Sequence, residues 1–264
     1  MNIRDIEFSR NFLVLSDGVH FPASAVKLAA QFADGFQKNL AVVCLNPHPD
    51  DAFSMQLEKL KAERAETCSY WCVDGTLDDV IDLTERTETP ILFIEISPKG
   101  SFSKPMRFFK GLHELRIPFV LVRAGMEIRP MDRVVVPIGY LVEEREKAPY
   151  TSNMGRFLDT EIVLLQANDY GSKTPANIQE ICKLYNSFKL RYQIVKAQKD
   201  SFKVEREACQ KADELVAGMA VFSTSRDYGL DDLLFGPKEL DAYQRCPVPA
   251  MFINPRKDLY VLCW

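Results

Sequence analysis

Short apolar runs alternate with longer amphipathic stretches along the whole chain. In the first half, the apolar runs predict buried strands of a parallel sheet. The stretches between them carry apolar residues at helical spacing and predict helices. The expected strands are Asn11–Ser16, Leu40–Leu45, Ser69–Val73, Ile91–Ile96 and Pro118–Val122, and the expected helices are Pro22–Lys38, Asp51–Thr67, Thr76–Thr87 and Met106–Leu115.

The same alternation begins again after Gly125. Its expected strands are Arg133–Ile138, Glu161–Gln166, Arg191–Lys196, Met219–Phe222 and Val248–Ile253, and its expected helices begin at Pro149, Pro175, Ser201 and Gly236-Pro237. Strands and helices in strict alternation predict an α/β fold, with helices on both faces of a parallel sheet. Two such series indicate an internal duplication of about 125 residues per copy. We therefore expect domains at 1–125 and 130–255, followed by an apolar tail at 256–264.

One segment of the second copy lacks an apolar stripe. Leu141–Ala148 is highly charged, and its cluster Glu143–Lys147 reads EEREK. This pattern predicts a solvated surface turn, with the helix proper beginning at Pro149. In that helix Met154 and Phe157 share one face, and Phe188 lies on the apolar face of the next helix.

Composition narrows the class of protein. The chain has 264 residues, 47% of them hydrophobic and 27% charged, with a net charge of -4. This balance provides no bulk attraction to nucleic acid or to an anionic membrane. The first ten residues are too charged for a signal peptide, and no apolar run is as long as a membrane span. We expect a cytoplasmic protein whose scattered cysteines are reduced core thiols: Cys44, Cys68, Cys72, Cys182, Cys209, Cys246 and Cys263.

Particular residues carry a family resemblance. The first strand ends in Asp17-Gly18, Val73-Asp-Gly75 precedes the third helix, and Ile117-Pro118 and Cys246-Pro247 lead into the closing strand of each copy. On these residues the chain resembles a tandem universal stress protein. The resemblance implies two tandem open five-stranded parallel-sheet α/β/α units, packed as an intramolecular pseudo-dimer. It also implies a non-enzymatic role in the stress response, through protein contacts or small-ligand sensing.

Family members that hold ATP carry Gly-x2-Gly-x9-Gly-Ser/Thr after the fourth strand and an Asp at the end of the first. Glycines let the backbone approach phosphates, and the helix N-terminus supplies N–H donors. In the second copy this frame falls on Ser223, Arg226, Gly236 and Pro237, so only one of its positions matches. The first strand of this copy ends in Gly139 instead of Asp. We therefore expect that the second domain has lost ATP binding.

The first copy departs from the frame in another way. It keeps Asp17 and Gly18, but its loop is shorter and basic. The alternative function is a switch that binds ATP or AMP in the first domain, and the plain interpretation is a solvated loop. The candidate ligand-binding residues are Asp17, Gly18, Lys99, Gly100, Ser101, Ser103 and Lys104.

A second motif resembles a different class. Residues 46–51, NPHPDD, resemble the His-Pro-Asp-Asp motif of zinc-dependent sugar-amide deacetylases. Ala52 stands where that family has Glu, and no later His-x-x-His follows. A metal-dependent hydrolase using His48 and Asp51 is thus a remote alternative to a turn in which Asp50 or Asp51 caps the next helix. We expect no catalytic residues and no metal, and at most weak nucleotide hydrolysis.

The remaining expectations concern partners. We expect no resident cofactor, no nucleic acid and no membrane, and an unidentified protein partner together with a small-molecule or nucleotide ligand. A homodimer formed through the apolar tail stays open. Phe102 and Phe108 beside the basic loop are candidates for stacking a base, whereas Phe109 is expected in the helix core.

Overall fold

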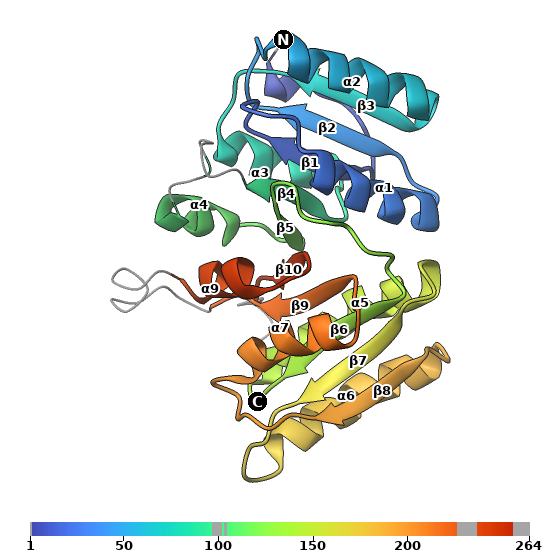
Figure 1. Ribbon diagram of the computed structural model, residues 1–264, viewed down its shortest axis with the longest axis vertical. Coiled ribbons are helices and arrows are strands. Elements are labelled where there is room, and N and C mark those ends of the chain that lie inside the picture. The colour runs from blue at the N-terminus through green and yellow to red at the C-terminus, as the bar shows by residue number, and fades with distance from the viewer. Residues whose placement is uncertain (1, 97–101, 103–104, 226–236, 256–264) are drawn as a thin grey trace. The chain divides into compact units, whose positions relative to one another are not determined.

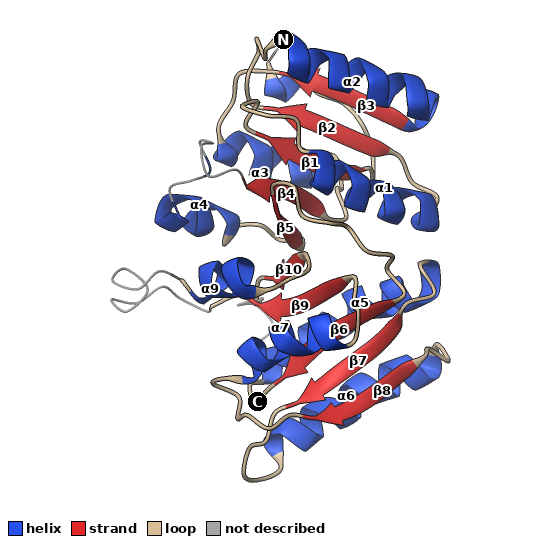
Figure 2. Ribbon diagram, viewed as in Figure 1, coloured by secondary structure: helices blue, strands red, loops and turns tan. Residues whose placement is uncertain are grey.

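The chain divides into two compact units, Met1–Glu127 and Ile128–Trp264. The structure is a computed structural model, and it describes every residue except 1, 97–101, 103–104, 226–236 and 256–264. Strands and helices alternate in both units (Figure 1). Each unit contains its own five parallel strands with helices on both faces (Figure 2).

In the first unit the strand order is β3-β2-β1-β4-β5, and every pairing is parallel. The helices α3 and α4 pack together, while α1 packs on β1, β2, β4 and β5. The strands are β1 (Phe12–Ser16), β2 (Leu40–Cys44), β3 (Cys68–Cys72), β4 (Leu92–Ile96) and β5 (Phe119–Arg123). The helices are η1 (Ile3–Asp5), α1 (Ala23–Phe36), α2 (Asp51–Arg64), η2 (Ala65–Thr67), α3 (Leu77–Arg86) and α4 (Pro105–Leu112).

The second unit repeats this plan with the order β10-β9-β6-β7-β8, again parallel. The helices α5 and α6 pack together, as do α7 and α9. The strands are β6 (Arg133–Ile138), β7 (Glu161–Gln166), β8 (Tyr192–Lys196), β9 (Met219–Ser223) and β10 (Ala250–Ile253). The helices are η4 (Val142–Glu146), α5 (Lys147–Phe157), α6 (Lys173–Ser187), α7 (Val204–Glu214) and α9 (Lys238–Arg245).

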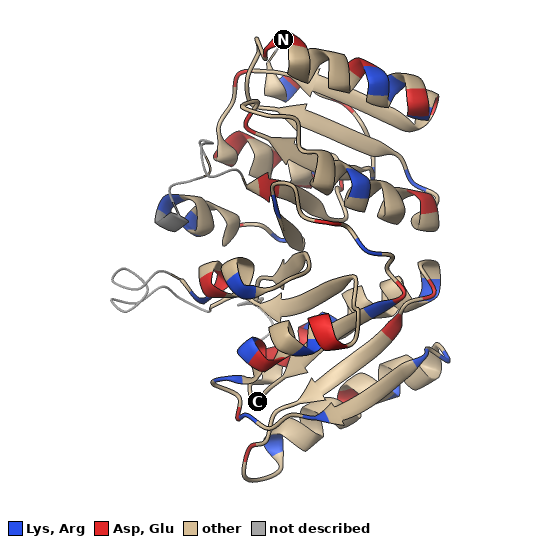
Figure 3. Cartoon of the chain, in the orientation of Figure 1, with Lys and Arg blue, Asp and Glu red and all other residues tan. Residues whose placement is uncertain are grey.

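The apolar strands form the core because helices cover both faces of each sheet. All five residues of β1, β2 and β4 are buried, and charged residues lie mainly on helices and loops (Figure 3). The Phe12 ring lies 5.8 Å from that of Phe32 and 6.1 Å from that of Phe93. Each such buried side chain stabilises the fold by about 1.5–3 kcal/mol.

Side-chain caps fix where two helices of the first unit begin. The carboxylate of Asp50 accepts a hydrogen bond from the N–H of Phe53 at 2.7 Å, so Asp50 caps α2. Thr76 and Asp79 form a capping box at the start of α3. Residues 46–51 therefore form a turn in which Asp50 caps α2, as expected if the NPHPDD motif is not a metal site.

The charged segment at 143–147 is not the solvated turn that the sequence predicts. Val142–Glu146 forms a 3₁₀ helix, and α5 begins at Lys147 rather than at Pro149. Glu143, Glu144 and Lys147 are all buried. Charged residues tolerate this burial because Glu144 and Lys147 pair with each other, at 2.8 Å.

Two aromatic residues expected on apolar helix faces are partly exposed. Phe157 is 43% exposed and Phe188 is 44% exposed. The Arg156 guanidinium lies 5.0 Å from the first ring and 4.6 Å from the second. The Arg156 cation contacts both rings, and this cation–π interaction stabilises them although they are partly exposed.

The six cysteines of the described residues form no disulfide with one another, and four of them are buried. The seventh, Cys263, lies outside the described residues. In the part of the chain that the structure describes, no helix combines the length and the apolar character needed to cross a membrane.

Candidate functional site

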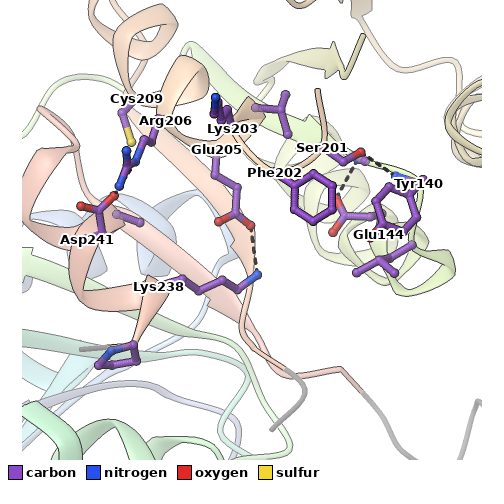
Figure 4. A pocket seen from close by; sticks show the side chains of 15 residues that line it. Tyr140, Glu144, Ser201, Phe202, Lys203, Glu205, Arg206, Cys209, Lys238 and Asp241 are labelled. Carbon is purple, nitrogen blue, oxygen red and sulfur yellow. Dashed lines mark hydrogen bonds and ion pairs between the residues drawn. The ribbon is translucent and has the colours of Figure 1, made fainter. Parts of the chain in front are cut away.

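The second unit has a hollow of about 610 Å³ beside the carboxyl end of β6 (Figure 4). In open α/β sheets, ligands bind at this edge. Three segments form it: the loop after β6, the start of α7 and the start of α9. The lining residues are Gly139, Tyr140, Leu141, Glu144, Ser201, Phe202, Lys203, Val204, Glu205, Arg206, Cys209, Pro237, Lys238, Asp241 and Ala242.

Most charges in this hollow are already paired. Lys238 lies 3.2 Å from Glu205, and Arg206 lies 3.0 Å from Asp241. Burial would lower the pKa of the Lys238 ammonium, but Glu205 and two further glutamates hold it above its ordinary value. Lys203 has no ion-pair partner among the described residues. The hollow therefore offers a balanced set of charges and little net field for a polyphosphate.

The position of the family's first-strand Asp is closed in this unit. A Cβ added at Gly139 would lie 2.7 Å from the Ser201 hydroxyl oxygen. That hydroxyl accepts a hydrogen bond from the N–H of Tyr140 at 2.9 Å and donates to the carboxylate of Asp169. Asp169 also accepts from the N–H of Ser201 at 2.9 Å. An aspartate side chain in place of Gly139 would displace this network.

A buried ion pair stands behind the same loop. Lys147 donates to the carbonyl of Pro137 at 2.6 Å and to the carboxylate of Glu144 at 2.8 Å. Glu144 also accepts from the N–H of Gly139 at 3.1 Å. Burial alone would raise the pKa of Glu144, but Lys147 and this N–H hold it below its ordinary value. The pair fixes the end of β6 and provides no free charge for a ligand.

The N-terminus of α9 holds a carboxyl group of the chain itself. Glu239, in the first turn, is fully buried and accepts a hydrogen bond from the N–H of Ser225 at 2.5 Å. Its own N–H also contacts this carboxyl group. The other oxygen, Oε2, has no hydrogen-bond partner among the described residues. Burial raises the pKa of Glu239 above its ordinary value. An internal acid thus takes the place where a helix N-terminus would receive a phosphate.

The first unit keeps the predicted Asp17 and Gly18 at the end of β1. Asp17 accepts a hydrogen bond from the N–H of Val19 at 3.1 Å. Gly18 has φ +74, and a Cβ there would lie 2.4 Å from the Asn46 Cβ and 2.7 Å from the Cys44 sulfur. Only glycine fits this turn, because the positive φ and the close approach both exclude a side chain.

Sequence reasoning missed two residues of the first unit, His20 and Glu95. Glu95 is the only charged residue of β4 and is 4% exposed. It accepts hydrogen bonds from the N–H groups of Ser24 and Ala25, at 2.8 and 3.0 Å, and so caps α1. Its other oxygen lies 3.3 Å from Nε2 of His20. Burial raises the pKa of Glu95, and the bonds to α1 act against that rise. A lone acid inside an apolar strand was the available signal.

The structure describes only some of the predicted site residues. Asp17 and Gly18 lie together after β1, Ser223 ends β9, and Pro237 directly precedes α9 as its N-cap. Pro237 makes no side-chain cap hydrogen bond. The other predicted residues lie outside the described part of the chain: Lys99, Gly100, Ser101, Ser103, Lys104, Arg226 and Gly236.

The aromatic residues near the basic loop are packed among themselves. The rings of Phe102 and Phe108 are stacked with centroids 5.1 Å apart, and each is at most 7% exposed. Phe109 is buried, as expected for the helix core. Phe102 and Phe108 line a hollow of about 710 Å³ with Thr76 and Arg107. The two rings are therefore largely buried against each other, and only a small part of each is exposed.

Among the described residues, no group of three or more His, Cys, Asp or Glu side chains is placed to hold a metal ion. His48 lies in the turn before α2, where its N–H donates to the Asn46 side chain at 3.0 Å. The Asp50 carboxylate is used as the cap of α2.

Comparison with known proteins places the fold. No protein-family model matches the chain, and no curated protein sequence matches it. A universal stress protein from Archaeoglobus fulgidus superposes with a TM-score of 0.63 at 15% identity, over 95% of this chain and 98% of that one. A functionally unknown protein from Pseudomonas aeruginosa superposes at 0.65 and 14% identity, over 98% and 96%. Another Pseudomonas aeruginosa protein, provisionally described as a universal stress protein, superposes at 0.61 and 15% identity, over 95% of each chain.

These superpositions cover nearly the whole chain, so they include both units. The chain has the fold of the universal stress proteins, and the resemblance found in the sequence is confirmed for the fold.

Proposed function

We propose that this chain is a universal stress protein-like, non-enzymatic regulatory protein of the stress response whose second unit no longer binds ATP. It acts through protein contacts or by sensing a small ligand. The α/β/α fold of both units supports the family role.

The observation that carries the loss of ATP binding is the position of Glu239. Its carboxyl group is fully buried at the N-terminus of α9 and accepts the N–H of Ser225. A phosphate bound there would need the same donors and would meet a buried acid instead. Gly139 adds to this, because its contact with Ser201 leaves no space for an aspartate at the end of β6.

Thermal unfolding with added nucleotides tests the proposal. The full chain is heated with Mg-ATP, AMP and cyclic nucleotides, each at millimolar concentration. A ligand that binds only the folded state raises the midpoint by mass action. We expect no saturable shift that depends on the second unit. A saturable shift that survives Asp17→Ala and disappears in Lys238→Ala would contradict the proposal.

Nucleotide binding by the first unit is the second candidate function. It is favoured by Asp17, which stays at the carboxyl end of β1 beside the tight turn at Gly18. In that case the saturable shift appears in the natural chain and is abolished by Asp17→Ala. No shift with any nucleotide would end this candidate.

A further inference from the structure

A basic and apolar surface lies at the carboxyl edge of the second unit's sheet. We name it the edge surface and define it by Leu141, Tyr170 and Phe202 together with Lys173, Lys199 and Lys203. These residues come from the connections that follow β6, β7 and β8, except Lys173, which is the first residue of α6.

The three connections begin side by side because their strands end in register. Ile138 pairs with Gln166, and Gln166 pairs with Lys196. Beyond the strands, the N–H of Asn168 donates to the carbonyl of Lys199 at 2.8 Å. The N–H of Tyr140 donates to the Ser201 hydroxyl at 2.9 Å. These bonds join the connections into one continuous surface.

The apolar members of the edge surface face water. Tyr170 is fully exposed, Phe202 is 82% exposed and Leu141 is 38% exposed. Single exposed apolar residues are ordinary, but apolar residues gathered on adjoining loops are typical of an interaction site. The Tyr140 ring lies 6.0 Å from that of Phe202, with the two ring planes tilted against each other. Aromatic side chains that become buried on binding are frequent anchors of protein–protein interfaces.

The charge of the edge surface is opposite to that of the whole chain. Lys173, Lys199 and Lys203 are exposed, and none makes an ion pair with a described residue. Asp200 is exposed among them, and its carboxylate accepts the N–H of Phe202 at 3.2 Å. Asp169 is used by Ser201 and Thr174. The buried Glu207 carboxylate also lies here and accepts the N–H groups of Gln198 and Lys199. Asp169 and Glu207 are thus held by internal donors, and the exposed charges are three lysines and Asp200. In a chain with a net charge of -4, this mainly positive exposed charge favours an acidic occupant.

Two hollows provide places for side chains of that occupant. The hollow of about 610 Å³ includes Phe202 and Lys203, and a second of about 390 Å³ includes Lys173. Tyr140 and Leu141 line both hollows. A peptide that crosses Tyr140 and Leu141 would place one apolar side chain in each hollow. Its acidic residues would then lie near the lysines.

We propose that the edge surface docks an acidic segment of a partner protein that carries apolar side chains between its carboxylates. This deepens the protein-contact role and rests on the proposed function. Apolar side chains enter the two hollows, and Lys173, Lys199 and Lys203 receive the carboxylates. The lysines determine the sign of the partner and the rate of encounter, and the rings contribute most of the affinity.

The test uses the full chain and a short fluorescein-labelled peptide in which Glu and Asp alternate with Leu and Phe. We expect saturable binding by fluorescence anisotropy that weakens as salt is added. The variant Lys199→Glu/Lys203→Glu should bind about tenfold more weakly, and Phe202→Ala should weaken binding by a similar factor. Both changes are at exposed positions, so the fold is retained.

The matched control is Lys27→Glu/Lys38→Glu, which changes the net charge equally at two exposed lysines of the first unit. It should leave the affinity unchanged. Equal weakening in both double variants would overturn the proposal, because it would show a response to net charge alone. Absence of peptide binding would overturn it too. So would binding that appears only after removal of residues 256–264, because the chain's own end would then be the occupant.

Two further titrations distinguish a protein partner from a membrane and from a nucleotide. Preferential binding to phosphatidylserine vesicles over the peptide would overturn the proposal in favour of a membrane. Each titration is repeated with Mg-ATP. If ATP binds the second unit while the peptide still binds the edge surface, the proposed loss of nucleotide binding fails and the docking proposal stands.

Discussion

The backbone N–H of Ser225 donates a hydrogen bond of 2.5 Å to the carboxyl group of Glu239 at the N-terminus of α9. The donor follows β9, and the acceptor belongs to the first turn of the helix that follows. This bond joins the backbone just after β9 to the first turn of α9. The proposed loss of ATP binding rests on it, because a helix N-terminus is a place where a phosphate can bind and here an internal acid lies there.

The pH dependence of stability should report this buried acid. Burial raises the pKa of Glu239 above its ordinary 4.5. The folded state is therefore favoured below that value, and this contribution is lost as the pH rises through the folded-state pKa. Glu239→Gln removes the titration. Urea unfolding should show the variant gaining free energy of unfolding relative to the natural chain as the pH rises from 4.5. A constant difference across that range would contradict the buried acid.

The Glu144–Lys147 pair predicts strong coupling in a double-mutant cycle. Lys147→Met leaves the Glu144 carboxylate buried without its cation and should cost about 3–5 kcal/mol of unfolding free energy. Adding Glu144→Gln should recover part of that loss, because the stranded charge is removed. The pKa of Glu144 is lowered, so its contribution is present above the unfolded pKa and is lost as the pH falls through the folded one. Additive losses would show that the two residues do not pair.

Substitutions at two glycines with nearly equal φ distinguish the cost of backbone strain from the cost of steric contact. Gly18 has φ +74 and close neighbours, whereas Gly125 has φ +73 and nothing within 4 Å. Gly125→Ala should cost about 1–2 kcal/mol, the usual cost of a left-handed conformation. Gly18→Ala should cost clearly more, because its Cβ would lie 2.4 Å from that of Asn46. Equal losses in thermal unfolding would show that the contact relaxes freely.

Glu95 should be the cap of α1 in solution. Glu95→Ala removes the acceptor of the Ser24 and Ala25 N–H groups and should cost about 1–3 kcal/mol. Amide hydrogen exchange should quicken most at those two positions, since Pro22 provides no side-chain cap. Uniform quickening along α1 would indicate general loosening instead of a lost cap.

The fold was predictable because its signals are local. Buried strands such as Leu40–Cys44 are apolar at every position, and helices between the strands begin after capping residues such as Thr76. The repeat of this pattern gave two units. The burial of Glu144 and Lys147 was not predictable, because the carbonyl of Pro137 and the N–H of Gly139 that satisfy them are contacts of the folded chain.

The sequence predicts a degenerate phosphate loop before α9 from the spacing back from Gly236, and most of that loop lies outside the described residues. It could not show that Glu239 turns inward, since acids in a first helical turn usually face water and favour the helix dipole. A special role for Glu95 could be predicted, because it is an acid within an apolar strand. Its hydrogen bonds to α1 could not, because they depend on where that helix packs on the sheet.

Photolabelling with an azido-ATP analogue, followed by peptide mapping, tests directly whether the second unit binds ATP. The full chain is labelled with and without excess Mg-ATP, and Glu239→Gln serves as the comparison. We expect no ATP-protected label between residues 128 and 255 of the natural chain, which belong to the second unit. Protected labelling on the peptides that contain Ser223 or Lys238 would contradict it.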